Sequence, residues 1–180
     1  SLLPMMKLRF AQPEHLIDIN RIPELKGIRE DGNTVVIGAM TVENELITSP
    51  ILQAKVPLLC EAAKLIADPQ VRNRGTIGGS LANNDPAACY PAAALGLGAT
   101  IHTTNRKIAA DDYFLGMFAT ALEEGELITA ISFPIPQKAA YAKFRQPASR
   151  FALVGVFVAQ TAAGARVAIT GAGNGVFRHA

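Results

Sequence analysis

A glycine-rich segment between two helical patterns constrains this chain more than any other feature of its sequence. From Arg72 to Pro86 the sequence reads R-N-R-G-T-I-G-G-S-L-A-N-N-D-P, with three glycines and a run of small polar residues. Such a stretch is costly in chain entropy, which indicates that something comes close to its backbone. Consecutive main-chain N–H groups can form a concave anion site, with the Thr76 and Ser80 hydroxyls as further donors, so a diphosphate is a candidate ligand. A loop that only turns between packed elements remains the alternative at this point.

Strand and helix patterns alternate along the chain before this segment. Asp31-Gly32 predicts a hairpin turn ahead of a buried strand over residues 34–39. From Thr41 onward, apolar residues at spacings of three and four predict amphipathic helix that breaks at Ser49-Pro50 and ends near Asp68-Pro69.

The alternation continues after the segment. Asp85-Pro86 predicts the start of an alanine-rich helix, which Gly96 and Gly98 end. Another helix is predicted over residues 111–121, and a strand that ends near Pro134 and Pro136 places a domain boundary there. The further predicted strands cover residues 100–104, 126–133, 141–146, 151–160 and 165–170.

Composition excludes several classes of protein. Among 180 residues, 49% are hydrophobic and only 18% are charged, which rules out disorder as the main state. The formal net charge of +2, with the two signs interspersed, argues against nucleic acid or an anionic membrane surface as the main partner. No apolar window reaches the roughly 18 residues that a membrane helix requires, and the opening S-L-L-P-M-M-K-L-R-F resembles a chain entered midway rather than a secretory leader. Cys60 and Cys89 stand alone, which indicates a reducing, cytoplasmic setting.

Other candidate sites are weak. The glycines within residues 171–175 suggest a nucleotide fold, but Val176 stands in place of the third glycine and no helix can follow within the remaining residues, so a hairpin or loop is predicted. The acidic pairs Asp111-Asp112 and Glu123-Glu124 are explained by a helix start and a solvated turn. The histidines are scattered and have no partner at a metal-ligand spacing; they are His15, His102 and His179.

The segment from Asp68 to Thr100, above all V-R-N-R-G-T-I-G-G-S-L-A-N-N-D-P-A-A-C-Y-P, resembles the FAD-binding medium subunit of the molybdenum hydroxylases, the family of xanthine dehydrogenase and aerobic carbon monoxide dehydrogenase. The likeness extends through I-G-A-M-T, E-L-I-T-A-I-S-F-P, Y-A-K-F-R and F-A-L-V-G-V. It implies an α+β fold: a two-lobed FAD-binding domain of the molybdopterin dehydrogenase type over residues 1–136, without its N-terminal strand-helix-strand and first glycine loop. The start of a small C-terminal α+β domain would follow over residues 137–180.

The resemblance also implies which residues contact FAD. Relatives often carry aspartate, an acceptor for ribose hydroxyls, where this chain has Cys89, and both a buried small residue and a cofactor contact remain open for that thiol. One glycine loop would bind the pyrophosphate, Asn83 would lie near phosphate and ribose, Ile128 would make an apolar contact, and Tyr141 and Arg145 would lie close to the flavin ring. The loop residues are Thr76, Ile77, Gly78, Gly79 and Ser80, with Ser1 and Leu2 left from the other loop.

The function that the resemblance implies is electron transfer through FAD, without catalytic acid or base side chains and without activity of this chain alone. Molybdopterin cofactor would lie on a large partner subunit and 2Fe-2S clusters on a small iron-sulfur subunit, and peripheral membrane association through the complex stays open. Two alternatives are a flavin-free structural subunit of such a complex and, from the second glycine cluster, a nicotinamide-dependent dehydrogenase fragment.

Overall fold

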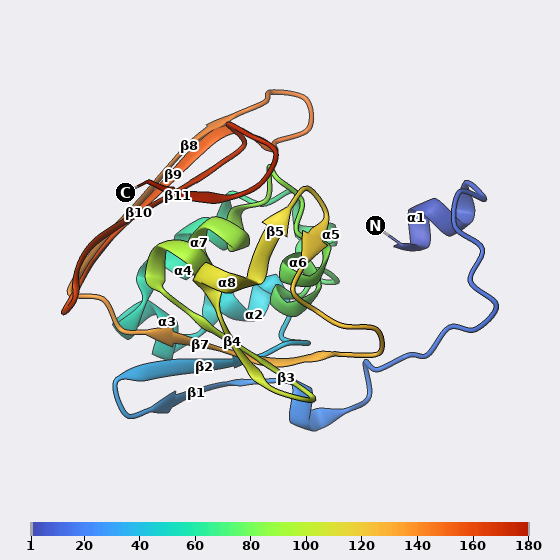
Figure 1. The fold of residues 1–180 in the computed structure, drawn as a ribbon, viewed down its shortest axis with the longest axis horizontal. Helices are drawn as coiled ribbons and strands as arrows, with labels where there is room; N and C mark the ends of the chain where they lie inside the picture. The colour runs from blue at the N-terminus through green and yellow to red at the C-terminus, as the bar shows by residue number, and fades with distance from the viewer. Residues whose placement is uncertain (1, 180) are drawn as a thin grey trace.

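Two antiparallel sheets lie on either side of a layer of helices in the computed structural model, which describes residues 2–179 (Figure 1). The larger sheet has the strand order β1-β2-β7-β3-β4, and the smaller one has the order β11-β10-β9-β8. This arrangement confirms the predicted α+β fold class. The strands are β1 (Ile28–Asp31), β2 (Thr34–Gly38), β3 (Thr100–Thr103), β4 (Lys107–Ala109), β5 (Phe114–Gly116), β6 (Ala119–Thr120), β7 (Ile128–Pro134), β8 (Lys138–Arg145), β9 (Ala152–Thr161), β10 (Gly164–Thr170) and β11 (Phe177–His179).

The helices between the sheets are short, and prolines set several of their starts. Pro50 and Pro57 each occupy the first helical turn, where a missing N–H costs nothing, so the helix predicted after the Ser49-Pro50 break is divided again. The helices are α1 (Leu2–Lys7), α2 (Glu43–Thr48), α3 (Pro50–Lys55), α4 (Pro57–Lys64), α5 (Pro69–Arg72), α6 (Ile77–Asn83), α7 (Cys89–Leu97) and α8 (Ala110–Tyr113), with a 3₁₀ turn at Pro23–Leu25.

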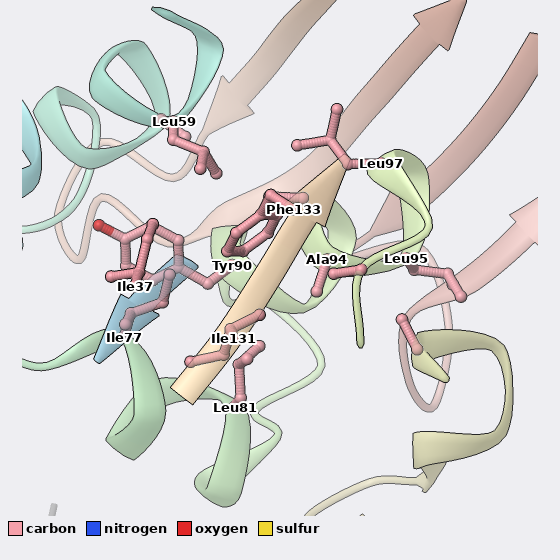
Figure 2. Close-up of a cluster of buried hydrophobic side chains, with 14 of the residues drawn as sticks. Ile37, Leu59, Ile77, Leu81, Tyr90, Ala94, Leu95, Leu97, Ile131 and Phe133 are labelled. Carbon is pink, nitrogen blue, oxygen red and sulfur yellow. The ribbon is translucent and has the colours of Figure 1, made fainter. Parts of the chain in front are cut away.

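Helix α7 forms the centre of the core. Every one of its residues is buried, because it packs against the smaller sheet on one side and against β7 and α4 on the other. Its composition of alanine, glycine and leucine suits this position, since small side chains let both sheets approach closely. Figure 2 shows the large side chains that complete the core, including Ile37, Tyr90, Ile131 and Phe133. The helix begins at Cys89 and not at Pro86 as predicted, because the Asp85 side chain accepts from the Ala87 N–H at 2.8 Å and forms a turn instead.

The hairpins are confirmed where their turn residues predicted them. Asp31 and Thr34 pair across the Asp31-Gly32 turn in β1 and β2, and Gly32 adopts the positive φ of 58° that this turn requires. The turn at residues 162–163 joins β9 to β10, and residues 171–175 form the predicted loop, here between β10 and β11.

The helix predicted over residues 111–121 is wrong beyond Tyr113. The chain turns instead into the β5–β6 hairpin, because the Asn84 side-chain amide donates to the carbonyls of Gly116 and Ala119, at 2.8 Å each. These contacts come from a residue about 30 positions away, and they satisfy carbonyls that a helix would have used internally.

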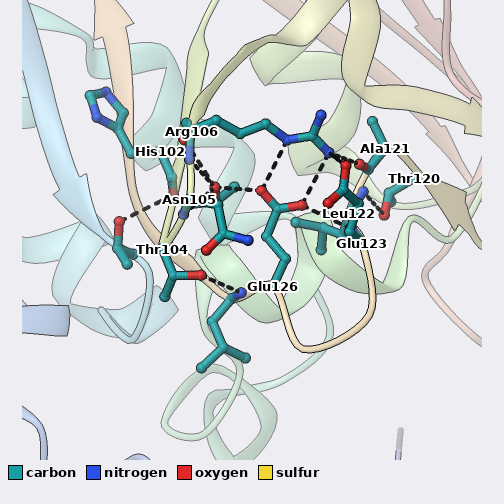
Figure 3. Close-up of polar contacts among 12 residues, drawn as sticks. His102, Thr104, Asn105, Arg106, Thr120, Ala121, Leu122, Glu123 and Glu126 are labelled. Atoms are coloured by element: carbon teal, nitrogen blue, oxygen red, sulfur yellow. Dashed lines mark hydrogen bonds and ion pairs between the residues drawn. The ribbon is translucent and has the colours of Figure 1, made fainter.

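A polar network joins the β3–β4 turn to the segment before β7 (Figure 3). Arg106 Nε lies 3.1 Å from Glu126 Oε1, and its Nη2 donates to the Ala121 carbonyl at 2.7 Å. Thr103 Oγ1 donates to the same carboxylate at 2.6 Å, and the hydrogen bonds from Arg106 and Thr103 lower the pKa of Glu126 to about 2. The network is structural, since it holds three chain segments together away from the cleft described next.

Candidate functional site

A cleft of about 360 Å³ opens beside the N-terminal end of α7. It lies among α2, α5, α6 and the loop from β8 to β9, so it brings together residues that are far apart in the sequence. This main cleft is lined by Glu43, Ile66, Ala67, Val71, Ser80, Asn83, Asp85, Ala87, Ala88, Cys89, Lys143, Ser149, Arg150 and Phe151.

A second hollow of about 350 Å³ adjoins the main cleft. Arg145, Pro147 and Arg150 line it, and Arg150 therefore belongs to both. Arg150 is held in place by a hydrogen bond from Nη1 to the Ala67 carbonyl at 3.0 Å. With Lys143 in the main cleft, these arginines give the two hollows a cationic side suited to phosphate groups.

The glycine segment forms the first turn of α6 and not an open loop. Thr76 caps the helix, with Oγ1 accepting from the Gly79 N–H at 3.2 Å. The N–H groups of Ile77 and Gly78 donate to the carbonyls of Thr41 and Ala39, and that of Ser80 donates to Thr76. The anion nest of free amides expected from the sequence is therefore not what this structure shows, because all four amides have protein acceptors.

The two adjacent glycines of the segment, Gly78 and Gly79, have different surroundings. Gly78 is buried, and a Cβ placed on it would lie 2.6 Å from Ala39 Cβ and 2.7 Å from Ala39 O, so its role is close packing of α6 against the end of β2. Gly79 is exposed, and a Cβ there would meet only Thr76 Oγ1, at 2.9 Å. The face of α6 that reaches the main cleft is the one carrying Ser80 and Asn83.

Cys89 is the first residue of α7 and is 3% exposed. Two residues of β8 reach its sulfur: Tyr141 OH donates at 3.2 Å, and Lys143 Nζ donates at 3.3 Å as well as to the Leu65 carbonyl at 2.9 Å. Burial raises the pKa of the Tyr141 hydroxyl. The thiol thus lies at the wall of the main cleft in a small polar cluster, although it is almost fully enclosed.

A buried acidic side chain that the sequence did not single out also lines the cleft. Glu43 is 5% exposed, and its Oε2 has no hydrogen-bond partner. Its removal from solvent raises its pKa to about 7, although the guanidinium of Arg72 acts in the opposite direction. One sequence pattern could have indicated that Glu43 is buried. It lies three residues before the apolar Leu46, which places both side chains on one face of α2.

The remaining predicted residues are dispersed. Leu2 lies on α1, which stands apart from the body of the molecule and has no buried residue (Figure 1). Ile128 lies in the hydrophobic core on β7, Arg145 lines only the second hollow, and Ser1 lies outside the described residues. The main cleft therefore unites Ser80, Asn83 and Cys89 of the predicted set.

A comparison with protein-family models decides the family. The model described as "FAD binding domain in molybdopterin dehydrogenase" matches residues 1–136. The chain belongs to this family. The cleft beside α6 and α7 is accordingly the cleft of a FAD-binding domain of the molybdopterin dehydrogenase type, and the resemblance stated from the sequence is confirmed.

Similar proteins extend the likeness of this FAD-binding domain beyond residue 136. The carbon monoxide dehydrogenase medium chain of Hydrogenophaga pseudoflava is 56% identical over 171 residues, which cover 91% of this chain and 60% of that protein. The glyceraldehyde dehydrogenase medium chain of Sulfolobus acidocaldarius is 41% identical over 165 residues, covering 88% of this chain and 59% of that protein. The chain thus spans about 60% of the length of these curated relatives.

A solved structure shows the same arrangement. A chain of carbon monoxide dehydrogenase from Hydrogenophaga pseudoflava superimposes with a TM-score of 0.92 at 53% identity, over 98% of this chain and 66% of that one. Within residues 2–179, no helix has the length and apolarity needed to cross a membrane, and no group of three or more His, Cys, Asp or Glu side chains is placed to hold a metal ion.

Proposed function

We propose that this chain is the FAD-binding part of the medium subunit of a molybdenum hydroxylase, and that it transfers electrons from iron-sulfur clusters on a partner subunit through FAD to an acceptor. One observation carries the proposal: in a FAD-binding domain of this family, the main cleft places Lys143, Arg150 and the Ser80 hydroxyl around a single hollow. Cations and hydroxyls in a partly enclosed hollow are the donors that a dinucleotide diphosphate requires.

The residues present fit FAD. The two hollows share Arg150, which supports an extended ligand running from one into the other. The cationic side chains match the two negative charges of the diphosphate. When bound, FAD supplies the capacity to accept and release electrons in one- or two-electron steps.

The protein's own residues bind, orient and shield in this proposal. Lys143 and Arg150 hold the diphosphate, and Ser80 donates from the first turns of α6. Gly79 is placed near the pyrophosphate, because it is the exposed glycine of its segment. Thr76 caps α6 and Ile77 and Gly78 are buried, so these three residues hold the first turn of the helix in position. Asn83 lies beside phosphate and ribose at the cleft wall.

The flavin end of the proposal rests on the second hollow. Arg145 lies there and is proposed to approach the flavin ring. Tyr141, on the same strand, lines neither hollow but donates to Cys89 at the wall of the main cleft, and it is proposed to lie near the same ring. Ile128, on β7 in the hydrophobic core, contributes by packing. Ser1 and Leu2 are proposed to approach the pyrophosphate. No acid or base side chain is required, because the chemistry belongs to the cofactor.

The partners proposed are a large molybdopterin-binding subunit and a small iron-sulfur subunit in a cytoplasmic complex. The relatives bear the names of medium chains of dehydrogenases for carbon monoxide and for glyceraldehyde, which supports a division of labour in which substrate choice lies on another polypeptide. Among residues 2–179 the two cysteines are free and buried on different helices, which is unlike a cluster-binding set.

The test is FAD binding by the full-length protein. Purified protein should be yellow and should bind FAD saturably in a fluorescence titration. Arg150→Ala should weaken FAD binding roughly 10- to 100-fold, since a charge-assisted hydrogen bond contributes about 1.5–3 kcal/mol. Arg29→Ala, which removes an exposed arginine on β1, is the matched control and should leave affinity unchanged. A colourless protein without saturable binding would favour the flavin-free structural subunit and end the proposal.

The nicotinamide alternative loses its only support. Residues 171–175 lie in a loop between two antiparallel strands, where Gly171 N donates to the Pro86 carbonyl at 2.8 Å. No helix follows the loop before residue 179, so the described chain offers no helix N-terminus for a phosphate at this place.

A further inference from the structure

Three buried polar atoms without hydrogen-bond partners gather beside the main cleft. They are Glu43 Oε2, Arg72 Nε and Tyr90 OH, from α2, α5 and α7. The three groups are close enough to shift one another's pKa. The charge of Arg72 lowers the pKa of Glu43, and the pKa of Tyr90 is raised by Glu43 and lowered by Arg72. Buried polar atoms left unpaired destabilise a fold, and a hydrogen-bond donor on a ligand would relieve the one that lies at the cleft.

Only one of the three side chains lines the cleft. Glu43 does so, whereas Tyr90 is fully buried behind it and Arg72 donates through Nη1 to the Ile66 carbonyl at 2.7 Å. Glu43 is therefore the member of the cluster that borders the cleft, with its Oε2 enclosed at the wall of the hollow.

We propose that Glu43 is a ligand-contacting residue, whose carboxylate accepts a hydrogen bond from a sugar hydroxyl of the bound dinucleotide. The inference rests on the proposed function, since it takes FAD as the ligand of the main cleft. A carboxylate repels phosphate and accepts from O–H groups, so the part of the ligand facing Glu43 differs from the part facing Lys143 and Arg150.

The size of the cleft supports a sugar as that part. A hollow of about 360 Å³ has room for a diphosphate together with a neighbouring sugar. In FAD one phosphate is joined to the ribose ring of the adenosine part and the other to the ribityl chain of the flavin part, and both carry free hydroxyl groups. A carboxylate that shares one hollow with phosphate-binding cations therefore faces the hydroxyls next to the diphosphate.

The charged and titratable groups around Glu43 set how its contact depends on pH. Burial opposes its ionised form, whereas Arg72 of α5 favours it, and Tyr90 of α7 is a neighbouring titratable group. Lys143, Arg150 and Asp85 are the other charged groups that line the cleft. Because the pKa of Glu43 is raised to about 7, its ionised fraction, and with it the acceptor, increases between pH 6 and pH 8.

The experiment compares FAD dissociation constants of the full-length wild type, Glu43→Gln and Glu45→Gln by flavin fluorescence from pH 6 to pH 8. Glu45 is the matched control, because it lies on the same helix and is exposed. Wild type and Glu45→Gln should bind FAD about tenfold more tightly at pH 8 than at pH 6, as expected for binding to the ionised form of a group with this pKa. Glu43→Gln should bind several-fold more weakly at pH 8 and should lose most of the pH dependence.

Smaller probes separate the two sugars and control for general damage to the cleft. AMP and FMN are tested as competitors of FAD. If the hydroxyl belongs to the ribose, Glu43→Gln should bind AMP more weakly than wild type does, and if it belongs to the ribityl chain, Glu43→Gln should bind FMN more weakly. Either result supports the inference. Inorganic pyrophosphate should bind Glu43→Gln at least as tightly as wild type, because the substitution removes a repelling charge. Weaker pyrophosphate binding would show that the substitution damages the cleft as a whole and would overturn the inference.

The outcomes also distinguish this inference from the proposed function. If wild type and both variants fail to bind FAD, the proposed function fails and the inference fails with it. If wild type and Glu45→Gln bind FAD and Glu43→Gln matches them in affinity and in pH dependence, the inference alone is overturned.

Discussion

Replacing Gly78 by alanine should destabilise the protein far more than the same replacement at Gly79, although the two glycines are adjacent in one motif. The new methyl carbon at residue 78 would lie 2.6 Å from Ala39 Cβ, 2.7 Å from Ala39 O and 2.9 Å from Ala39 Cα. Favourable carbon–carbon contacts lie near 3.5–4.0 Å, so α6 and the end of β2 would have to separate by about 1 Å. Both are backbone elements of the buried core, which do not move independently.

The magnitude follows from three contributions. Forcing an extra methyl group into packed structure costs about 1–3 kcal/mol. Separating the two elements also breaks the 2.9 Å hydrogen bond from Gly78 N to Ala39 O, and leaving those buried groups unpaired costs about 1–3 kcal/mol. The higher helix propensity of alanine returns about 1 kcal/mol. The net loss is about 3 kcal/mol, which corresponds to a decrease in Tm of roughly 6–12 °C for a domain of this size.

Gly79→Ala is the matched control. A Cβ there meets only the Thr76 hydroxyl, so a disturbed cap and the gain in helix propensity nearly cancel, at about 1 kcal/mol each. Thermal and urea unfolding of the full-length protein, followed by circular dichroism, measure both variants. The order should reverse in a FAD titration of folded protein, where the exposed methyl at residue 79 weakens binding. A Gly78→Ala protein that melts within 2 °C of wild type, by the same approximate scale, would refute the packing argument.

Three further predictions concern stability. The free energy of unfolding should fall as pH rises from about 5 to 8, because the folded pKa of Glu43, about 7, exceeds its unfolded value. Glu43→Gln should remove this decline. At pH 8 its free energy of unfolding, measured by urea titration, should exceed that of wild type by on the order of 2 kcal/mol, after allowance for partial solvent access. For Glu126 the sign is opposite, because Arg106 holds its folded pKa at about 2, below the unfolded value. The ionised carboxylate therefore stabilises the fold above the unfolded pKa, and this stability is lost as pH falls toward 2. Glu126→Gln should be less stable than wild type at neutral pH, and its free energy of unfolding should change less on titration with acid. Thr170→Val removes a buried hydroxyl that lies 2.8 Å from the Pro86 carbonyl. The free energy of unfolding, measured in urea, should fall by about 1–2 kcal/mol. Unchanged stability would contradict a role for this contact in packing β10 against the start of α7.

Local chemistry explains which elements the sequence predicted correctly. Asp31-Gly32 predicted its hairpin because the turn needs a residue that tolerates positive φ, and Gly32 supplies it. Pro50 predicted a helix boundary for an equally local reason. The strands of the smaller sheet followed from β-branched and aromatic residues bounded by turn residues.

The errors occur where a distant contact decides the backbone. Residues 114–120 lost their predicted helix to the side chain of Asn84, and no short-range pattern reveals that partner. The segment around Gly78 was predicted to be open to an anion, but the close approach of Ala39 had already taken up the space and the amide. A glycine needed for packing and a glycine needed for a ligand look the same in a single sequence.

The sequence likewise predicted only part of the candidate site. The sequence by itself determined the fold class, the family and the region around α6 and the start of α7, because these depend on residue types at short spacings that the chain carries wherever it folds. Only the tertiary structure decided that Glu43, Lys143 and Arg150 line one cleft, since the 100 or so residues between Glu43 and the other two must first fold into the core that holds them there. Charge and burial at such a place belong to the assembled fold, and the pKa of Glu43 follows from that assembly.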